Sequence, residues 1–478
     1  MTTRPFDTLR QAQGAKVGMR PRWVALLAIS LGVLIQPLNS TMLVVALPRI
    51  GAALGVDAAL SAWLITAYLL ATVIAQPTLG KLGDRLGHRR MFLAGEVVSG
   101  LGALAASAAG DFPSLVLFRV VQAVAGAALV PSGVALLRDL YGPHERGRAL
   151  GIYSAALGLT AAAGPVLGGY LLGFGDWPVL FYVSVPVIAL SIALMLYAVP
   201  QRPAQDAPRH RFDVWGAVTA GAALLGFLLA LSLGPRAGWT SAVVVVSGVA
   251  AVVFGILFFA QERRHPEPVV NLRFFRNPAF ASAVASIFFQ NMVMYSTLIL
   301  IPLFLQNVQK RPASDTGVLL AVMSATSAVL TPIGGSLSDR VGRRWPVVFG
   351  ALLVLAGVSL QITLRETTSL TWIAAGLAAA GMGLGLSSAA MQTAAIEAFP
   401  ADVAGSAAGL YSTLRYLGST IGSALIAIAL AGESNSAAAF GRAFSWFTLA
   451  ALAAVASAWG LPTKGPIADS RWQIADSR

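Results

Sequence analysis

The sequence predicts an all-α, polytopic membrane protein that crosses the bilayer fourteen times, as two related six-helix bundles with two further helices inserted between them. Three observations indicate this fold class. Of the 478 residues, 56% are hydrophobic and 11% are charged, whereas a soluble domain carries about 25% charged residues. Apolar runs long enough to cross the hydrocarbon layer as helices recur to the end of the chain. A short charged sequence from the first half returns in the second half with the same spacing.

The apolar runs are unbroken rather than alternating, which favours a helical bundle over a closed barrel. Each run begins and ends near polar or turn-forming residues, and tryptophans gather close to the expected ends. The expected spans are 23–47, 58–79, 91–109, 114–137, 149–172, 179–198, 214–234, 242–260, 279–304, 316–334, 346–363, 371–398, 404–430 and 438–460.

These spans group into two sets of six with a pair between them. We expect the first bundle over 23–198, the second over 279–460 and the inserted pair over 214–260. The inserted pair carries almost no polar side chains, so we expect it to face lipid. The remaining segments are an N-terminal segment, two links and a tail, expected at 1–22, 199–213, 261–278 and 461–478.

The positive charge of the chain is explained by topology. Of 33 Lys and Arg residues, 25 fall in segments on the side of the N-terminus and six on the other side. Such an excess marks the cytoplasmic face, so both termini are predicted to be cytoplasmic. The net charge of +13 therefore requires no nucleic-acid partner.

The repeated sequence lies between the second and third spans of each bundle. The two copies, Gly80–Arg90 and Gly335–Arg344, are called the hinges below. Seven positions match at an offset of 255 residues: Pro77/Pro332, Gly80/Gly335, Leu82/Leu337, Asp84/Asp339, Arg85/Arg340, Gly87/Gly342 and Arg89/Arg344. Repeats of this kind are typical of transporters built from two related halves.

The hinge composition favours a gate made of ion pairs. A carboxylate at a helix end near the membrane requires a donor, and glycines allow a tight turn and close helix approach. A plain topology anchor of positive charges is the alternative. The candidate gating residues in the hinges are Gly80, Asp84, Arg85, Gly87, Arg89, Gly335, Asp339, Arg340 and Gly342.

Four stretches resemble the major facilitator superfamily, and specifically its 14-span drug–proton antiporter branch. They are the paired hinges, Leu38 to Pro48 at the end of span 1, Leu115 to Pro131 in span 4, and Gly164-Pro165-Val-Leu-Gly168-Gly169 in span 5. The resemblance implies the major facilitator fold, with two pseudo-symmetric bundles, a central cavity and transport by alternating access. It also implies that Gly164, Pro165, Gly168 and Gly169 seal the pathway against leak, although a simple small-residue contact face is the alternative.

The chain departs from this pattern at the residue expected to carry the proton. The resemblance implies an aspartate in span 1, where this chain has Asn39, which cannot titrate. The coupling acid has therefore moved, or coupling is absent, or the chain imitates the protonated state. Glu96 in span 3 is the remaining candidate, unless it is a static partner of Arg89 or Arg90. Arg119 in span 4 is the candidate partner of a proton-carrying carboxylate, with snorkelling to the interface as the alternative.

Polar and aromatic side chains on spans 1, 2, 4 and 9 form the expected substrate-binding surface. Such a mixture of aromatic, thioether and amide groups suits a bulky lipophilic ligand, although ordinary helix packing would account for each residue singly. The candidates are Gln36, Asn39, Tyr68, Gln122, Phe288, Gln290, Asn291, Met292 and Tyr295.

Together these features predict a secondary active transporter in the cell (inner) membrane that exports lipophilic compounds, as in multidrug efflux, by proton antiport. The alternative is an exporter of a lipid or another endogenous metabolite with altered or absent proton coupling. An enzyme is not expected, because no nucleophile–base pair and no metal-ligand spacing is visible and there is no ATP-binding loop. The expected partners are a small lipophilic substrate, protons and the bilayer, for a monomer without cofactors.

Overall fold

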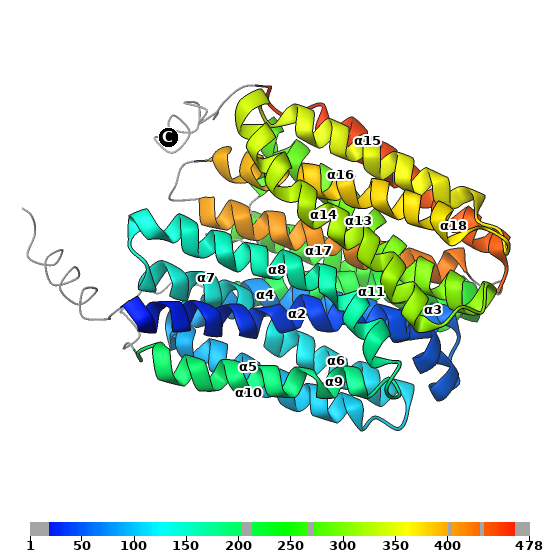
Figure 1. Cartoon of the computed structure of the whole chain (residues 1–478), viewed down its shortest axis with the longest axis horizontal. Coiled ribbons are helices and arrows are strands. Elements are labelled where there is room, and N and C mark those ends of the chain that lie inside the picture. Colours follow the sequence, from blue (N-terminus) through cyan, green and yellow to red (C-terminus); the bar gives the residue numbers. More distant parts are fainter. Residues whose placement is uncertain (1–18, 202–212, 266–271, 400–403, 431–434, 464–478) are drawn as a thin grey trace, which may run out of the picture.

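The computed structural model describes residues 19–201, 213–265, 272–399, 404–430 and 435–463, and these residues form helices and loops without a strand. The helices run roughly side by side along one direction (Figure 1). Most of the expected segments 1–22, 199–213 and 461–478, and part of 261–278, lie outside the described residues. The chain is therefore an all-α protein, as the sequence predicts.

Every expected span coincides with one helix or with two consecutive helices. The first half contains α2 (Met19–Leu54), α3 (Ala58–Ser61), α4 (Trp63–Leu86), α5 (His88–Ser107), α6 (Phe112–Gly126), α7 (Leu129–Leu140), α8 (Pro143–Leu171), α9 (Val179–Tyr182) and α10 (Ser184–Ala198). The second contains α13 (Pro278–Leu303), η2 (Phe304–Val308), α14 (Ala313–Val341), α15 (Arg344–Leu360), η3 (Gln361–Thr363), α16 (Leu370–Glu397), α17 (Ala404–Ala429) and α18 (Ala437–Ala458). A short helix, η1 (Leu272–Arg276), precedes α13.

Several helices begin with a cap that the sequence supplies. Asp111 precedes α6 and its carboxylate accepts the Ser114 N–H at 2.8 Å, while Pro113 occupies the first turn, where no N–H is needed. Asn277 caps α13 in the same way, accepting the Ala279 N–H at 3.0 Å. Such caps fix where the apolar helices start.

Among the described residues, ten helices or helix pairs are long and apolar enough to cross a membrane. In α4, the apolar part is the shorter stretch Trp63–Gln76, because hinge residues make up its last turns. The protein is thus a multi-pass membrane protein, and the number of fourteen crossings stays a prediction.

The helices α11 (Val214–Ala237) and α12 (Ala242–Arg264) pack mainly against each other. In α12 only Val244 and Glu262 are buried, so the helix presents an apolar surface outward, as a lipid-facing helix does. Helix α11 also contacts α4 and α17, with Leu228 packed between Leu70 and Ala424. The pair therefore rests on the junction of the two halves.

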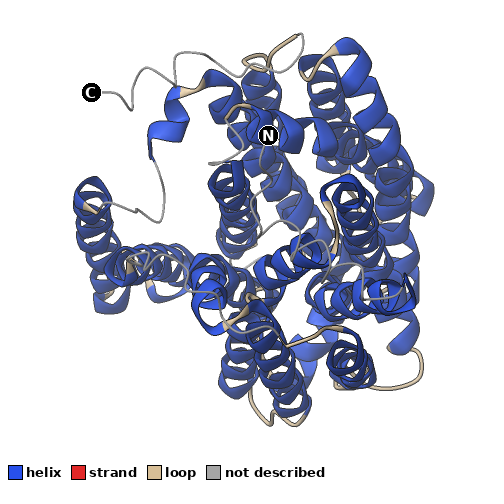
Figure 2. Cartoon of the chain, turned by 90° about the vertical axis from the view of Figure 1, so that its left-hand side faces the viewer, coloured by secondary structure: helices blue, strands red, loops and turns tan. Residues whose placement is uncertain are grey.

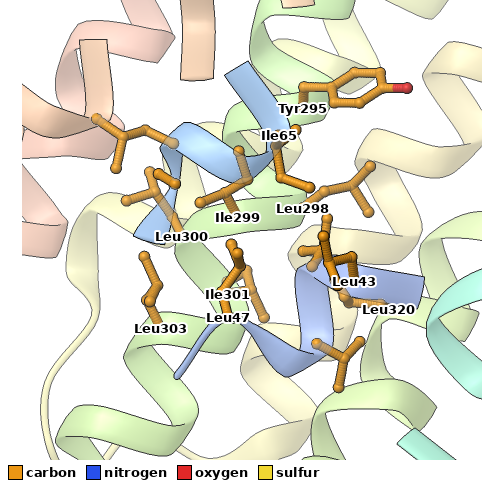
Figure 3. Close-up of a cluster of buried hydrophobic side chains, with 14 of the residues drawn as sticks. Leu43, Leu47, Ile65, Tyr295, Leu298, Ile299, Leu300, Ile301, Leu303 and Leu320 are labelled. Carbon is orange, nitrogen blue, oxygen red and sulfur yellow. The ribbon is translucent and has the colours of Figure 1, made fainter. Parts of the chain in front are cut away.

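The two ends of the bundle pack differently. We call the end that carries Gly87 and Gly342 the hinge end (left in Figure 1) and the opposite end the far end. At the far end a single hydrophobic core includes residues of both halves. Figure 3 shows Leu43, Leu47 and Ile65 of the first half among residues of α13 and Leu320 of α14.

At the hinge end the described residues form two cores, one in each half. One contains Ile29 and Phe92 of the first half, and the other contains Phe280 and Val347 of the second. In Figure 2, which looks at the bundle from the hinge end, the helices appear nearly end-on. The halves are joined at the far end and packed separately at the hinge end, which is the arrangement of a transporter closed on one side.

Candidate transport site and gate

Arg119 lies inside the first half rather than at the lipid interface. Its side chain is fully buried, and Nη1 donates to Gln122 Oε1 at 2.6 Å. The guanidinium carbon lies 4.2 Å from the centroid of the Tyr68 ring and 5.8 Å from that of Phe181. Among the residues that the structure describes, Nε and Nη2 have no hydrogen-bond partner, so part of the guanidinium group is left without an acceptor.

Gln36 of α2 packs against α6, the helix that carries Arg119 and Gln122. Its amide packs against Gly126 of α6, where a Cβ atom would collide with Gln36 Nε2. Gln36 Nε2 and Gln122 Nε2 also have no hydrogen-bond partner within the described ranges. The glycine permits the close approach of α2 and α6, about one helical turn from Gln122.

Glu96 occupies a separate, tight pocket between α5 and α2. It is fully buried, and neither carboxyl oxygen has a hydrogen-bond partner in the part of the chain that the structure describes. A Cβ atom on Gly32 would collide with Glu96 Oε1 and would lie 2.7 Å from the Phe92 ring. The neighbouring Ser191 hydroxyl donates to the Ala28 carbonyl at 2.9 Å. The absence of a side chain at residue 32 therefore creates the room that Glu96 fills.

No ion pair among the described residues joins Glu96 to Arg89, Arg90 or Arg119. Asn39 has a partner elsewhere in the first half, since its Oδ1 accepts the Ser184 hydroxyl at 2.6 Å. Arg119 with Gln122, and Asn39 with Ser184, thus form two separate hydrogen-bonded pairs.

The candidate residues of α13 divide between two faces. Gln290 is fully buried inside the second half, where its Oε1 accepts the Ser387 hydroxyl at 2.7 Å. Asn291 donates to the Ile287 carbonyl at 3.2 Å. Phe288 and Met292 lie along α17, where Gly418 and Gly422 allow its backbone to approach.

Tyrosines and two arginines gather where the halves meet. Tyr68, Tyr295 and Tyr416 are close enough to interact electrostatically with one another. The Arg415 guanidinium carbon lies 4.8 Å from the centroid of the Tyr416 ring. We call Arg119, Tyr68, Tyr295, Arg415 and Tyr416 the central site.

A hydrogen bond between side chains also joins the two halves. The Thr66 hydroxyl of α4 donates to the Ser423 hydroxyl of α17 at 2.7 Å. Arg415 was not among the residues singled out from the sequence, although it is an arginine within an expected span, which is the signal that identified Arg119.

The two hinges share one backbone feature. Gly87, between α4 and α5, has φ = 93°, and Gly342, between α14 and α15, has φ = 88°. Both lie in the left-handed region that glycine adopts without strain. Gly80 lies against Pro131 of α7, whereas Gly335 lies near Ala389 of α16.

The ion pairs of the second hinge differ from the expected ones. Asp339 accepts from Arg343 Nη1 at 2.6 Å, and Arg343 also pairs with Glu397 at the end of α16 at 3.0 Å. Arg340 is exposed and forms no ion pair among the described residues. Asp339 is thus held by Arg343, which follows the turn at Gly342, rather than by its neighbour Arg340.

In the first hinge, Arg85 is exposed and Arg89 is partly buried. The side chain of Asp84 lies outside what the structure describes, so the ion pairs of this hinge stay a prediction.

The glycines of α8 bring three helices together at the far end. A Cβ atom on Gly164 would collide with Thr41 of α2, and one on Gly168 would lie 2.7 Å from the Met42 carbonyl. Across the junction of the halves, a Cβ atom on Gly169 would lie 3.2 Å from the Cα of Gly317 in α14. Pro165 lies within α8, and its carbonyl faces Gly317. This face joins the halves through backbone contact.

An open hollow of about 270 Å³ lies on the outside of the first half, between α2, α8 and α10. Its one hydroxyl, that of Thr160, already donates to the Ala156 carbonyl at 2.8 Å. The hollow is apolar and involves one half alone, so the central site is the better candidate for substrate.

Two helical halves that meet around buried polar and aromatic groups, in a chain that crosses the membrane repeatedly, define a membrane transporter rather than an enzyme. The model of the Major Facilitator Superfamily matches residues 29–213 and 214–423. The chain belongs to that superfamily.

Its curated relatives include transporters named for export or resistance. The chain is 31% identical over 422 residues to the tetracenomycin C resistance and export protein of Streptomyces glaucescens, covering 87% of this chain and 77% of that protein. It is 32% identical over 413 residues to the multidrug resistance protein Stp of Mycobacterium tuberculosis (strain CDC 1551 / Oshkosh), covering 86% and 76%. It is 34% identical over 430 residues to the uncharacterized MFS-type transporter YwoD of Bacillus subtilis, covering 88% and 93%.

Solved structures share the fold at low sequence identity. The peptide transporter POT in complex with sulfate superposes with a TM-score of 0.70 at 16% identity, over 94% of this chain and 97% of that one. A bacterial homolog of the human lysosomal transporter Spinster, in an inward-facing and unoccupied conformation, gives 0.63 at 17% identity, over 93% and 98%. At this identity the likeness concerns the fold alone.

Proposed function

We propose that this protein exports lipophilic compounds from the cytoplasm by proton antiport through alternating access. One observation carries the proposal. The halves share one hydrophobic core at the far end and have two separate cores at the hinge end. With the hinges on the cytoplasmic side, as the Lys and Arg distribution predicts, this conformation accepts substrate from the cytoplasm. The names of two relatives, one for multidrug resistance and one for tetracenomycin export, support the substrate class.

In this proposal Glu96 carries the proton. It is the acidic side chain buried without a partner in the helix that follows the first hinge, and Asn39 cannot replace it. An ionised carboxylate without a partner is costly inside a membrane. Glu96 therefore binds a proton where it is enclosed and releases it where a different packing of the halves admits water or a donor.

Arg119 supplies the positive charge that the cycle requires. Its Nε and Nη2 have no hydrogen-bond partner among the described residues, so no acceptor offsets that part of its charge. Tyr68 covers the guanidinium from one side, which limits its contact with water. Substrate arrival and proton release would then be linked through the packing of α2, which contacts the Glu96 pocket through Gly32 and the Arg119 group through Gln36.

The hinges act as the gate of the cytoplasmic side in this proposal. Asp339 is held by Arg343 within its own half in the present conformation. When the hinge end closes, the charged hinge residues exchange these partners for partners in the opposite half, and the α8–α14 contact at the far end opens. We further propose that the protein acts as a monomer in the cell (inner) membrane, with both termini in the cytoplasm.

The substitution at span 1 supports one alternative. Because Asn39 stands where the antiporters carry an aspartate, the protein could export a lipid or another endogenous metabolite with altered or absent proton coupling. This alternative shares the fold, the hinges and the central site, and it differs in the driving force.

Efflux of a lipophilic dye from proteoliposomes, with and without an imposed pH gradient, distinguishes the two. We expect gradient-driven efflux for the chain as given, its loss in Glu96→Gln, and no change in Glu366→Gln, a control at an exposed residue of the α15–α16 loop. Efflux that ignores the gradient in the unsubstituted chain but follows it in Asn39→Asp would support the alternative. Unchanged coupling in both Glu96→Gln and Asn39→Asp would exclude both residues as the carrier.

A further inference from the structure

The charges at the junction of the two halves are unbalanced. Arg119 comes from the first half and Arg415 from the second, and both lie within membrane-spanning helices. Among the described residues, neither arginine forms an ion pair. Glu96, the buried acid of the first half, lies apart from them against Gly32 and Phe92. The central site therefore holds two cations without a counter-charge.

Tyrosines surround Arg415 where acids would be expected. The groups that interact electrostatically with Arg415 are Tyr416, Tyr411 and Tyr295. Arg119 interacts in the same way with Tyr68. Contact with an aromatic face offsets part of the cost of a desolvated cation, but it leaves the guanidinium donors available for an acceptor.

The two arginines differ in access. Arg119 is fully buried beneath Tyr68, whereas Arg415 is partly exposed. Arg415 is therefore the residue that an incoming ligand can touch, and Arg119 adds positive potential from behind an aromatic ring.

The arginines are also not a by-product of the duplication. The 255-residue offset that relates the hinges takes Arg119 to Ala374 and brings Arg415 back to Thr160. The two halves thus place a cation at the same junction from different helices, α6 and α17.

We propose that the central site is selective for lipophilic anions, namely aromatic compounds that carry a carboxylate, sulfonate or phenolate, with Arg415 binding the negative group. A planar guanidinium binds such a group through two parallel hydrogen bonds. The rings of Tyr68, Tyr295 and Tyr416 provide an apolar surface with polar edges for the aromatic part. The inference rests on the proposed transport function and names the substrate class of the same site.

The test compares two dyes that differ mainly in a sulfonate. The anion 8-anilinonaphthalene-1-sulfonate and the neutral N-phenyl-1-naphthylamine are bound to the full-length protein in phosphatidylcholine nanodiscs, with empty nanodiscs subtracted. We expect the anion to bind at least tenfold more tightly. Arg415→Gln should remove most of this preference and leave the neutral dye unchanged, while Arg415→Lys keeps part of it because the charge remains. Arg365→Gln, at an exposed far-end residue, is the matched control.

Equal loss of both dyes in Arg415→Gln, or an anion preference that survives it, would overturn the proposal. If Arg415→Gln does not fold, the unsubstituted protein and Arg415→Lys are compared instead. Excess naphthalene sulfonate should displace the bound anionic dye better than excess naphthalene does, and less so in Arg415→Lys. Equal displacement by the two competitors would overturn the proposal. Nanodiscs containing phosphatidylglycerol distinguish the source of the anion. If phosphatidylglycerol weakens binding of the anionic dye to the unsubstituted protein but not to Arg415→Gln, the anion that the site binds is a lipid headgroup. If phosphatidylglycerol has no effect, the anion is a free amphiphile.

Binding requires neither a proton gradient nor transport, so the two proposals fail separately. Selective binding without gradient-driven efflux would leave the substrate class standing and remove the antiport proposal. Gradient-driven efflux together with equal binding of the two dyes would leave the antiport proposal standing and remove the substrate class.

Discussion

The two halves of this protein have the same order of helices but carry their buried polar groups at different places. In the first half, Glu96 fills the space left by Gly32. The equivalent positions in the second half, 255 residues later, are Ala351 and Ile287, and both are buried. Where one half encloses a carboxyl group, the other is filled by hydrocarbon.

Other pairs of equivalent positions carry glycine in both halves. Gly126 and Gly381 are related by the same offset, and each allows a close helix contact, with Gln36 in the first half and with the Met323 backbone in the second. The hinge glycines Gly87 and Gly342 keep the same backbone conformation. The shared features serve the architecture, and the features that differ carry the proposed chemistry.

The largest expected effect comes from giving the first half the pair of residues found in the second. In Gly32→Ile combined with Glu96→Ala, the isoleucine occupies the volume of the lost carboxyl group. The Phe92 ring, whose far edge a Cβ atom at residue 32 would meet at 2.7 Å, turns into the remaining space, so we expect a folded protein. We expect efflux driven by a pH gradient to vanish. Dye efflux from proteoliposomes and the elution profile of the purified protein check the two expectations.

The single variant Gly32→Ile tests whether residue 32 packs against Glu96. The new side chain collides with Glu96 Oε1 and Phe92, and overpacking of this kind costs about 1–3 kcal/mol. We expect a lower midpoint of thermal unfolding than for the double variant. Equal midpoints would mean that residue 32 does not pack against residue 96.

Arg119→Gln should have the next largest effect. It removes the hydrogen bond to Gln122 Oε1 and the contact with Tyr68, which together are worth on the order of 2 kcal/mol. We expect kcat/KM for dye efflux to fall roughly tenfold or more, with Arg365→Gln unchanged as the control. An Arg119→Gln variant that transports normally would remove this residue from the proposed cycle.

Gly317→Leu tests the contact between the halves at the far end. A side chain at residue 317 meets the Pro165 carbonyl, to which a Cβ atom would be 2.7 Å distant. We expect the α8–α14 contact to open, so that a thiol reagent added to the far side labels Met323→Cys faster, by several-fold. The chain has no cysteine of its own, so labelling is free of background.

The smallest effect is expected at the second hinge. Arg343→Ala breaks the pairs with Asp339 and Glu397, but the side chains of those acids are 72% and 36% exposed. Ion pairs of this kind contribute about 0–1 kcal/mol, so the unfolding midpoint should move little, while the rate of efflux changes if the hinge is a gate. An unchanged rate would favour the topology anchor over the gate.

Much of the fold could be predicted from the sequence, because apolar runs and a duplicated hinge are local signals. Which end of the bundle is closed could not be predicted, since the inward-open and outward-open conformations are built from the same helices. The pairing of Arg343 with Glu397 depends on residues 54 positions apart, which no local pattern reveals. Gln290 faces α16 through Ser387, and the helical period alone does not say which of two neighbouring helices a polar face meets.

The most direct measurement is the distance between spin labels on the two halves at two pH values. Labels at Leu86→Cys and Val341→Cys, both exposed at the hinge end, report the separation of the hinges. If protonation of Glu96 shifts the halves from one packing to the other, the distance distribution changes with pH in the otherwise unsubstituted protein. In Glu96→Gln the distribution should stay the same at both pH values. The same shift in both proteins would contradict it.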